Sequence, residues 1–197
     1  MQEKLKFPIL LKLTIAAAVL VVYLPLLNGF FQQDEWLVFG NFFGNGPRNF
    51  FELVANSFAL NVGHYVPFTL LTFSVFAAIF KLNYVYYVVL SLMLHLLIIY
   101  LVYLLSNKII KDRVLAFLVA ILFGFAAAGY QATAWIIADI NTHGATIFAL
   151  LSLILLFKFL ESKKLFLFIS SVAVLIISLL FKEIAIALFI LLPVVFY

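Results

Sequence analysis

The chain has 197 residues, of which 68% are hydrophobic and 10% charged, and its mean hydropathy is +1.26. A soluble domain usually carries about 25% charged and about 45–50% apolar residues, so this composition excludes a water-soluble fold. The absence of cysteine excludes disulfides and thiolate metal sites. The net charge of +4 is spread in short clusters between apolar runs, which is typical of a membrane protein and not of one that binds nucleic acid.

Long apolar runs predict transmembrane α-helices, because a span needs about 20 apolar residues at about 1.5 Å each. The first run is followed by no small-residue cleavage site, so we interpret it as an uncleaved helix. The last run reaches Tyr197 without a polar end, and we expect the sequence to be truncated at its C-terminus. We predict an all-α, polytopic transmembrane bundle, a single domain over 1–197 with about six spans near 8–27, 84–105, 114–136, 143–160, 165–181 and 184–197.

The apolar run at 66–80 would reach only about 22 Å as a helix, which is short for a span. If it does not cross, nine basic residues face the cytoplasm and three face the outside. If it does cross, five lie inside and seven outside, so the positive-inside rule favours the first arrangement. The inner residues are then Lys4, Lys6, Lys12, Lys108, Lys111, Arg113, Lys158, Lys163 and Lys164, and the outer ones Arg48, Lys81 and Lys182.

Residues 28–83 are therefore expected to form an extracytoplasmic first loop that carries juxtamembrane interfacial helices. Asn49 and Glu52 have the spacing of a capping box, which predicts a short helix from about Phe50 to Leu60. Pro67 suits the first turn of the 66–80 helix, where a missing N–H costs nothing. We expect a multi-pass protein of a bacterial plasma membrane with a cytoplasmic N-terminus.

Polar residues gather on the outer side in this topology, and ionisable groups near the hydrocarbon edge indicate function because they are costly to desolvate. The adjacent carboxylates of Asp34 and Glu35 could supply a general base. Lys182 or Arg48 could hold a phosphate, and His64 could move a proton. The other candidates on this side are Glu52, Lys81, Asp139, Asn141, His143 and Glu183.

Each of these residues also has a purely structural interpretation. Asp34 could cap a helix that begins near Trp36, and Lys182 with Glu183 could form an ordinary charged turn. Asp139 and His143 share one helical face, but a metal site needs more than two ligands. No metal-binding residues are predicted, and a divalent cation as cofactor stays open.

Four segments of the sequence carry a resemblance to a known family. They are Asp34-Glu35 after the first helix, His64-Tyr65-Val66-Pro67-Phe68-Thr69, Phe123-Gly124-Phe125 through Ala134-Trp135-Ile136, and Phe181-Lys182-Glu183-Ile184-Ala185 through Leu192-Pro193. Together they resemble the GT-C superfamily of polytopic glycosyltransferases, in particular the protein O-mannosyltransferases and the bacterial aminoarabinose-type transferases. The resemblance covers most of the chain, although Val66 precedes Pro67 where members often have proline or arginine, and Phe181 replaces a serine. Most members are also longer.

The resemblance implies transfer of a sugar from a polyprenyl-phosphate donor to a protein, lipid or glycan acceptor on the outer face, usually with inversion. It implies that Asp34 is the general base on the acceptor hydroxyl and that Glu35 binds or orients. Lys182 is the candidate for holding the donor phosphate, with His64, Glu183, Arg48 and Asp139 as further donor-binding candidates. A chain shorter than most members is also expected to lack part of the donor pocket.

Two other functions remain open. A transporter or flippase for a lipid-linked or polar solute is the alternative from another class, although such proteins usually show internal repeats and interrupted helices. The other is a membrane relative of the enzymes without catalytic activity.

Overall fold

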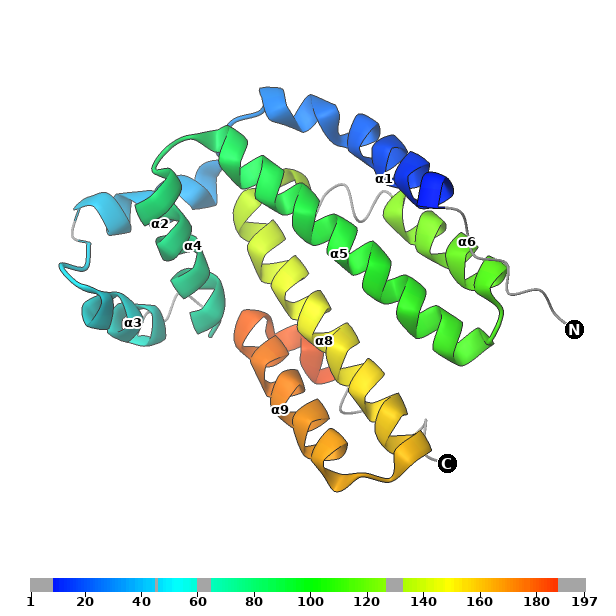
Figure 1. Cartoon of the computed structure of the whole chain (residues 1–197). Helices are drawn as coiled ribbons and strands as arrows, with labels where there is room; N and C mark the ends of the chain where they lie inside the picture. The colour runs from blue at the N-terminus through cyan, green and yellow to red at the C-terminus, as the bar shows by residue number, and fades with distance from the viewer. Residues whose placement is uncertain (1–8, 45, 60–64, 127–132, 188–197) are drawn as a thin grey trace, which may run out of the picture.

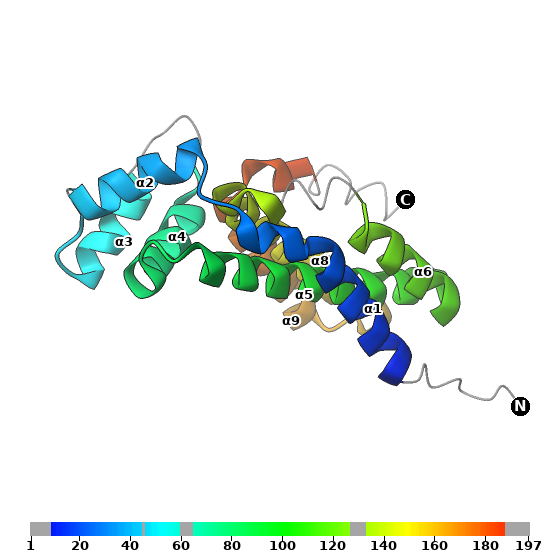
Figure 2. The same ribbon diagram turned by 90° about the horizontal axis from the view of Figure 1, so that it is seen from above.

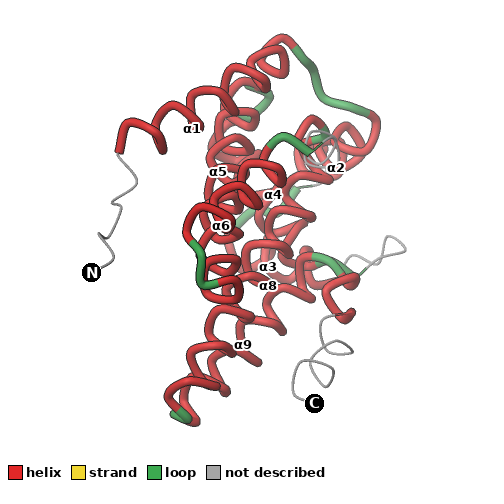
Figure 3. The backbone as a smooth tube through the Cα atoms, turned by 90° about the vertical axis from the view of Figure 1, so that its right-hand side faces the viewer, coloured by secondary structure: helices red, strands yellow, loops and turns green. Residues whose placement is uncertain are grey.

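The computed structural model describes residues 9–44, 46–59, 65–126 and 133–187. These residues form helices and no strand (Figure 3), which confirms the all-α prediction. In chain order the elements are α1 (Ile9–Tyr23), the 3-10 helix η1 (Leu24–Asn28), α2 (Gln33–Gly44), α3 (Phe50–Ala59), α4 (Pro67–Phe80), α5 (Tyr84–Ile110), α6 (Arg113–Gly124), α8 (Ile136–Ser162), α9 (Leu165–Phe181) and the 3-10 helix η2 (Glu183–Ile186) (Figure 1).

Two helices, α5 and α8, are long and apolar enough to cross a membrane. Each has 27 residues, which corresponds to about 40 Å of helix against a hydrocarbon core of about 30 Å. The other apolar helices of the described chain have 10–17 residues.

The two long helices run side by side in the same direction, and each is followed by a helix that returns along it (Figure 1). α6 packs against α5, and α9 packs against α8. The C-terminal ends of α5 and α8 are joined by an ion pair of 2.7 Å between Lys108 and Glu161. The α5–α6 turn therefore lies at one end of the molecule, with α2 and α3 at the other (Figures 1 and 2).

The short helices α2 and α4 are attached to α5 through an aromatic cluster. Phe31 makes edge-to-face contacts with Phe39 and Tyr87, with ring centroids 4.7 and 5.2 Å apart. Phe39 also contacts Phe73 of α4 at 4.9 Å. These side chains are buried, and such pairs add about 0.5–1.5 kcal/mol each beyond the burial of their area.

The local signals in the first loop are confirmed. Asn49 caps α3, because its side-chain oxygen accepts from the Glu52 N–H at 2.9 Å, and the Glu52 carboxylate accepts from the Arg48 N–H at 2.7 Å. α3 ends at Ala59, and Leu60 lies outside the described residues. Pro67 is the first residue of α4, as its missing N–H predicts.

The helix bounds differ from the expected spans in several places. The first span is divided after Tyr23 into α1 and η1, with Pro25 in the first turn of η1. α6 ends at Gly124, and Ile136, expected at the end of that span, instead begins α8. Residues 137–142, expected between two spans, are inside α8. Their polar side chains are accommodated there, because Asp139 contacts His143, Thr142 accepts a hydrogen bond from Lys182, and Asn141 lines a pocket. Of the predicted span 184–197, only the part up to residue 187 is described, and it begins as η2.

Candidate functional site

A pocket of about 420 Å³ lies where α2, α4, the start of α8 and the α9–η2 junction meet. Its lining contains Asp34, Lys182 and Glu183, which come from distant parts of the sequence. Trp135 and Asn141 line the same pocket, which we call the charged pocket. Its volume falls within the range of about 300–1,000 Å³ that is usual for small-molecule sites.

Lys182 enters the charged pocket because α9 ends just before it. Its backbone is extended (φ −157°, ψ 128°), which separates α9 from η2. The preceding Phe181 is fixed on both sides: its ring stacks on Phe148 at 5.5 Å, and its carbonyl accepts from the Thr69 hydroxyl at 2.9 Å. The position of Lys182 is therefore set by packing between α4, α8 and α9.

The half-buried Lys182 ammonium donates to the Thr142 hydroxyl at 3.0 Å. Among the described residues, no carboxylate forms an ion pair with it. An ammonium has three donors, so two remain for a ligand. A half-buried cation with no counter-ion in the described part of the chain suits an anion such as a phosphate.

The two neighbouring acids, Asp34 and Glu35, have different surroundings. Asp34 is exposed and lines the charged pocket. Glu35 is fully buried and accepts from the Gln32 N–H at 2.7 Å and from the Ile137 N–H at 3.1 Å. The first turn of α8 has no side-chain cap of its own, so the Glu35 carboxylate serves as its N-terminal acceptor and holds α2 to α8.

Glu183 fixes the opposite side of the pocket. Its carboxylate accepts from the Tyr65 N–H at 2.8 Å. Tyr65 lies two residues before α4, and Glu183 is the first residue of η2. This bond therefore joins the entry to α4 with the segment that carries Lys182.

Two further polar atoms at the charged pocket have no partner among the described residues. They are Nε1 of Trp135 and Oδ1 of Asn141, both buried. The sequence prediction did not include Trp135 or Thr142 as site residues. Their position within one turn of Asp139 or Asn141 was the available signal.

A second polar group lies in the interior between α5 and α8. Asp139 contacts Nδ1 of His143 one turn further along α8. Nε2 of His143 lies 3.4 Å from Nδ1 of His95, and Nε2 of His95 lies 3.1 Å from the Gly124 carbonyl oxygen. We call Asp139, His143 and His95 the buried histidine chain. The sequence prediction missed His95. The available signal was a single histidine within an otherwise apolar helix.

The structure thus brings together Asp34, Lys182 and Glu183 of the predicted site residues. Glu35 is next to the pocket but faces the interior, and Asp139 belongs to the buried histidine chain. Arg48 is exposed at the start of α3 and does not line the charged pocket. His64 lies outside the described residues.

Asp34 and Glu183 are the two carboxylates that a cation in the pocket would meet. Within the described ranges, no group of three or more His, Cys, Asp or Glu side chains could hold a metal ion. No protein-family model, no curated protein and no solved structure matches this chain.

Proposed function

We propose that this chain is a membrane glycosyltransferase of the GT-C type, which moves a sugar from a polyprenyl-phosphate donor to an acceptor hydroxyl. The observation that carries the proposal is the charged pocket, where the Asp34 carboxylate and the Lys182 ammonium line one cavity. These two groups match the two requirements of the reaction, which are removal of a proton and binding of a phosphate.

In this reaction the acceptor oxygen attacks the anomeric carbon of the donor sugar. A bond forms between these two atoms while the bond from the anomeric carbon to the phosphate oxygen breaks, and polyprenyl phosphate leaves with the electron pair. Asp34 takes the proton of the attacking hydroxyl. Lys182 stabilises the negative charge that grows on the leaving phosphate, and attack from the face opposite the phosphate inverts the anomeric centre.

The distribution of basic residues supports an outward-facing pocket in a multi-pass membrane protein. The α5–α6 turn carries Lys108, Lys111 and Arg113, and the α8–α9 turn carries Lys163 and Lys164. Both turns lie away from the short helices that line the pocket (Figure 1). By the positive-inside rule the basic turns and the N-terminus face the cytoplasm and the pocket faces the outside, which suits a bacterial plasma membrane.

The proposal is tested with polyprenyl phosphate in nanodiscs. We expect Lys182→Gln to weaken its binding about tenfold to a hundredfold, because a charge-assisted hydrogen bond contributes about 1.5–3 kcal/mol. Asp34→Asn should leave this binding intact but reduce sugar transfer in membranes about 10²–10⁴-fold, the usual contribution of a general base. Glu161→Gln, at the far end of α8, is the matched control. Normal transfer by Asp34→Asn would reject Asp34 as the general base, whereas no transfer by the wild type would leave a relative without this chemistry.

The orientation is tested separately, since the chain has no cysteine of its own. Single cysteines at Asn83, before α5, and at Asn107, in its last turn, would be treated with an impermeant thiol reagent on intact cells. Labelling at 83 alone is the expected result. Labelling at 107 alone would put the charged pocket on the cytoplasmic side and contradict the proposal.

One observation favours a transporter as the second candidate. The buried histidine chain lies between the two long helices α5 and α8. Ionisable residues within membrane-spanning helices often mark ion or substrate pathways. Proton-coupled transport would require His95 and His143, whereas glycosyl transfer would require Asp34 and Lys182. Proteoliposomes with an internal pH dye separate the two, because only the transporter would move protons when solute is added.

A further inference from the structure

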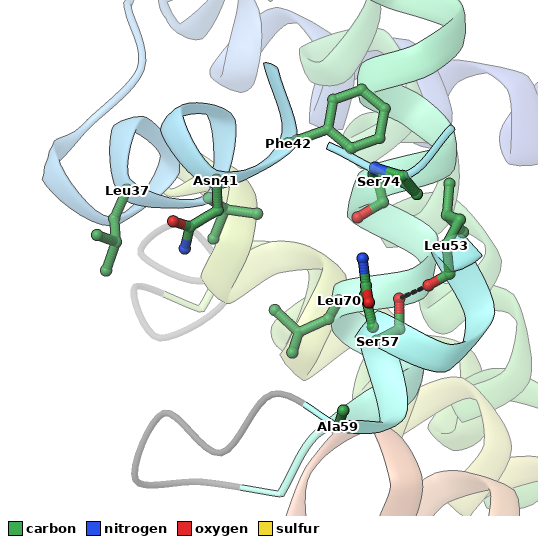
Figure 4. Close-up of a pocket in the computed structure, with 11 residues that line it drawn as sticks. Leu37, Asn41, Phe42, Leu53, Ser57, Ala59, Leu70 and Ser74 are labelled. Atoms are coloured by element: carbon green, nitrogen blue, oxygen red, sulfur yellow. Dashed lines mark hydrogen bonds between the residues drawn. The ribbon is translucent and has the colours of Figure 1, made fainter. Parts of the chain in front are cut away.

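A second pocket, of about 320 Å³, lies among the short helices α2, α3 and α4 (Figure 4). Leu37 and Asn41 point into it from α2, and Leu70 points into it from α4 (Figure 4). None of the described residues that line it is charged, and we call it the neutral pocket. Its volume is at the lower end of the range for small-molecule sites, which suits a single ring.

Each of the three helices gives the neutral pocket an uncharged hydrogen-bonding side chain. Asn41 comes from α2, Asn56 and Ser57 from α3, and Ser74 from α4. The Ser57 hydroxyl donates to the Leu53 carbonyl at 2.8 Å, so its own oxygen still accepts (Figure 4). An amide offers two donors and an acceptor, and a hydroxyl offers both roles. This set matches the alternating donors and acceptors of sugar hydroxyls.

The rest of the lining is apolar and includes Phe42, Leu53 and Leu70. Such walls pack against the C–H faces of a ring while the amides bind its hydroxyls. A hydrocarbon chain fits less well, because it would cover these polar groups without hydrogen bonds at a cost of roughly 1–3 kcal/mol each. The lining residues within the described ranges include no cation for a phosphate and no carboxylate for an amine.

The neutral pocket adjoins the charged pocket. Both are lined by Leu37, Val38 and Leu70, so these side chains lie at the boundary between the two pockets. A molecule bound across these three residues would have its uncharged part near Asn41 and its reacting atoms near Asp34 and Lys182.

We propose that the neutral pocket is a saccharide subsite, in which Asn41 and Asn56 hold the hydroxyls of one pyranose ring. This rests on the proposed function, and the ring belongs either to the donor sugar or to a glycan acceptor. The two sources share the same recognition chemistry, and the experiment distinguishes them.

The test uses methyl pyranosides of mannose, glucose, galactose and N-acetylglucosamine with the full chain in nanodiscs, since many detergents carry sugars themselves. Saturation-transfer NMR should detect binding of at least one glycoside. Asn41→Ala and Asn56→Ala should each weaken it about threefold to tenfold, the equivalent of one hydrogen bond. Ser74→Leu, which fills the pocket, should abolish it. Asn107→Ala, on α5 outside both pockets, is the matched control and should bind as the wild type does.

A second measurement compares polyprenyl phosphate with its mannosyl form. If the ring is the donor sugar, the mannosyl form binds more tightly, and Asn41→Ala removes the difference. If the ring belongs to the acceptor, Asn41→Ala weakens only the free glycosides. Either result supports the subsite.

The proposal is overturned if no glycoside binds, or if the Asn41→Ala and Asn56→Ala variants bind glycosides and mannosyl donor as the wild type does. Polyprenyl phosphate binding that still depends on Lys182 would then leave the proposed function intact. Glycoside binding that depends on Asn41, without any polyprenyl phosphate binding, would instead support the subsite and reject the polyprenyl donor.

Discussion

The charged pocket and the buried histidine chain are both built on the first turns of α8, but their surroundings differ. Trp135, Ala138 and Asn141, three residues apart, line the pocket. Asp139 and His143, four residues apart, face α5. The helical period thus separates polar residues that are neighbours in sequence onto two sides of one helix.

This separation determines what each group can do. Asp34 and Glu183 are exposed and Lys182 is half-buried, and all three line the charged pocket. Asp139, His143 and His95 are at most 3% exposed, and each contacts the next. Polar groups without water must satisfy one another, so we expect substitutions in the buried chain to affect stability and those in the pocket to affect binding.

The largest effect is expected for His143→Leu, which leaves the Asp139 carboxylate buried without its partner. Removing one member of a buried pair costs about 3–5 kcal/mol, and the melting temperature in nanodiscs should fall accordingly. The double change with Asp139→Asn removes the stranded charge and should recover much of the loss. Equal melting temperatures for the wild type and His143→Leu would show that the buried histidine chain contributes nothing to the stability of the folded state.

A substitution at Gly144 tests whether the packing of α8 against Phe181 positions Lys182 in the charged pocket. A Cβ at this position would overlap the Phe181 ring, and overpacking of this kind costs about 1–3 kcal/mol. We expect Gly144→Ala to lower the melting temperature and, by moving Phe181, to weaken polyprenyl phosphate binding at Lys182. Gly40→Ala is the control, because nothing lies within 4 Å of its added Cβ. A Gly144→Ala variant that binds normally would show that Lys182 does not depend on this packing.

The adjacent acids Asp34 and Glu35 allow a sharper comparison. Glu35→Gln replaces an acceptor oxygen at the starts of α2 and α8 and should cost about 0.5–2 kcal/mol, as loss of a helix cap does. Asp34→Asn, on the exposed side, should leave the melting temperature unchanged. The comparison fails if the two variants destabilise the protein equally, which thermal unfolding followed by circular dichroism would reveal.

The smallest effect is expected far from both groups. Lys108→Ala breaks the ion pair with Glu161, in which Glu161 is mostly exposed, and such pairs contribute about 0–1 kcal/mol. The melting temperature should decrease slightly in low salt and not at all in high salt. A salt-independent loss would mean that the packing of the lysine stem, and not its charge, is what matters.

The sequence predicted the elements whose signals are local. These are the Asn49–Glu52 cap of α3, the start of α4 at Pro67, and the helix at 165–181. The first two follow from residues within one turn, and the third from a continuous apolar run. The start of α8 could not be predicted in this way. Asp139 and Asn141 look like loop residues, and they are helical because partners or a pocket on other elements accommodate their side chains.

The candidate site shows the same limit. The sequence singled out Asp34, Lys182 and Glu183 as chemically unusual, and they line one pocket. It could not distinguish the exposed Asp34 from the buried Glu35, because that difference arises from the Ile137 N–H on another helix. Nor could it reveal the neutral pocket, whose asparagines and serines have no unusual pattern in the sequence.

In the turns after α5 and α8, the backbone conformation favours glycine, whereas the local charge requires a basic residue. Lys111 and Lys163 take left-handed backbone conformations, with φ of 58° and 56°, which glycine adopts with less strain. Each nevertheless puts a cation beside a helix C-terminus, in a cluster of the kind that retains a loop in the cytoplasm during insertion. Glycine at both positions would therefore relax the folded turns. In the proposed orientation it would also weaken the signal that holds these turns in the cytoplasm, so that orientation implies that some conformational stability is given up for correct insertion.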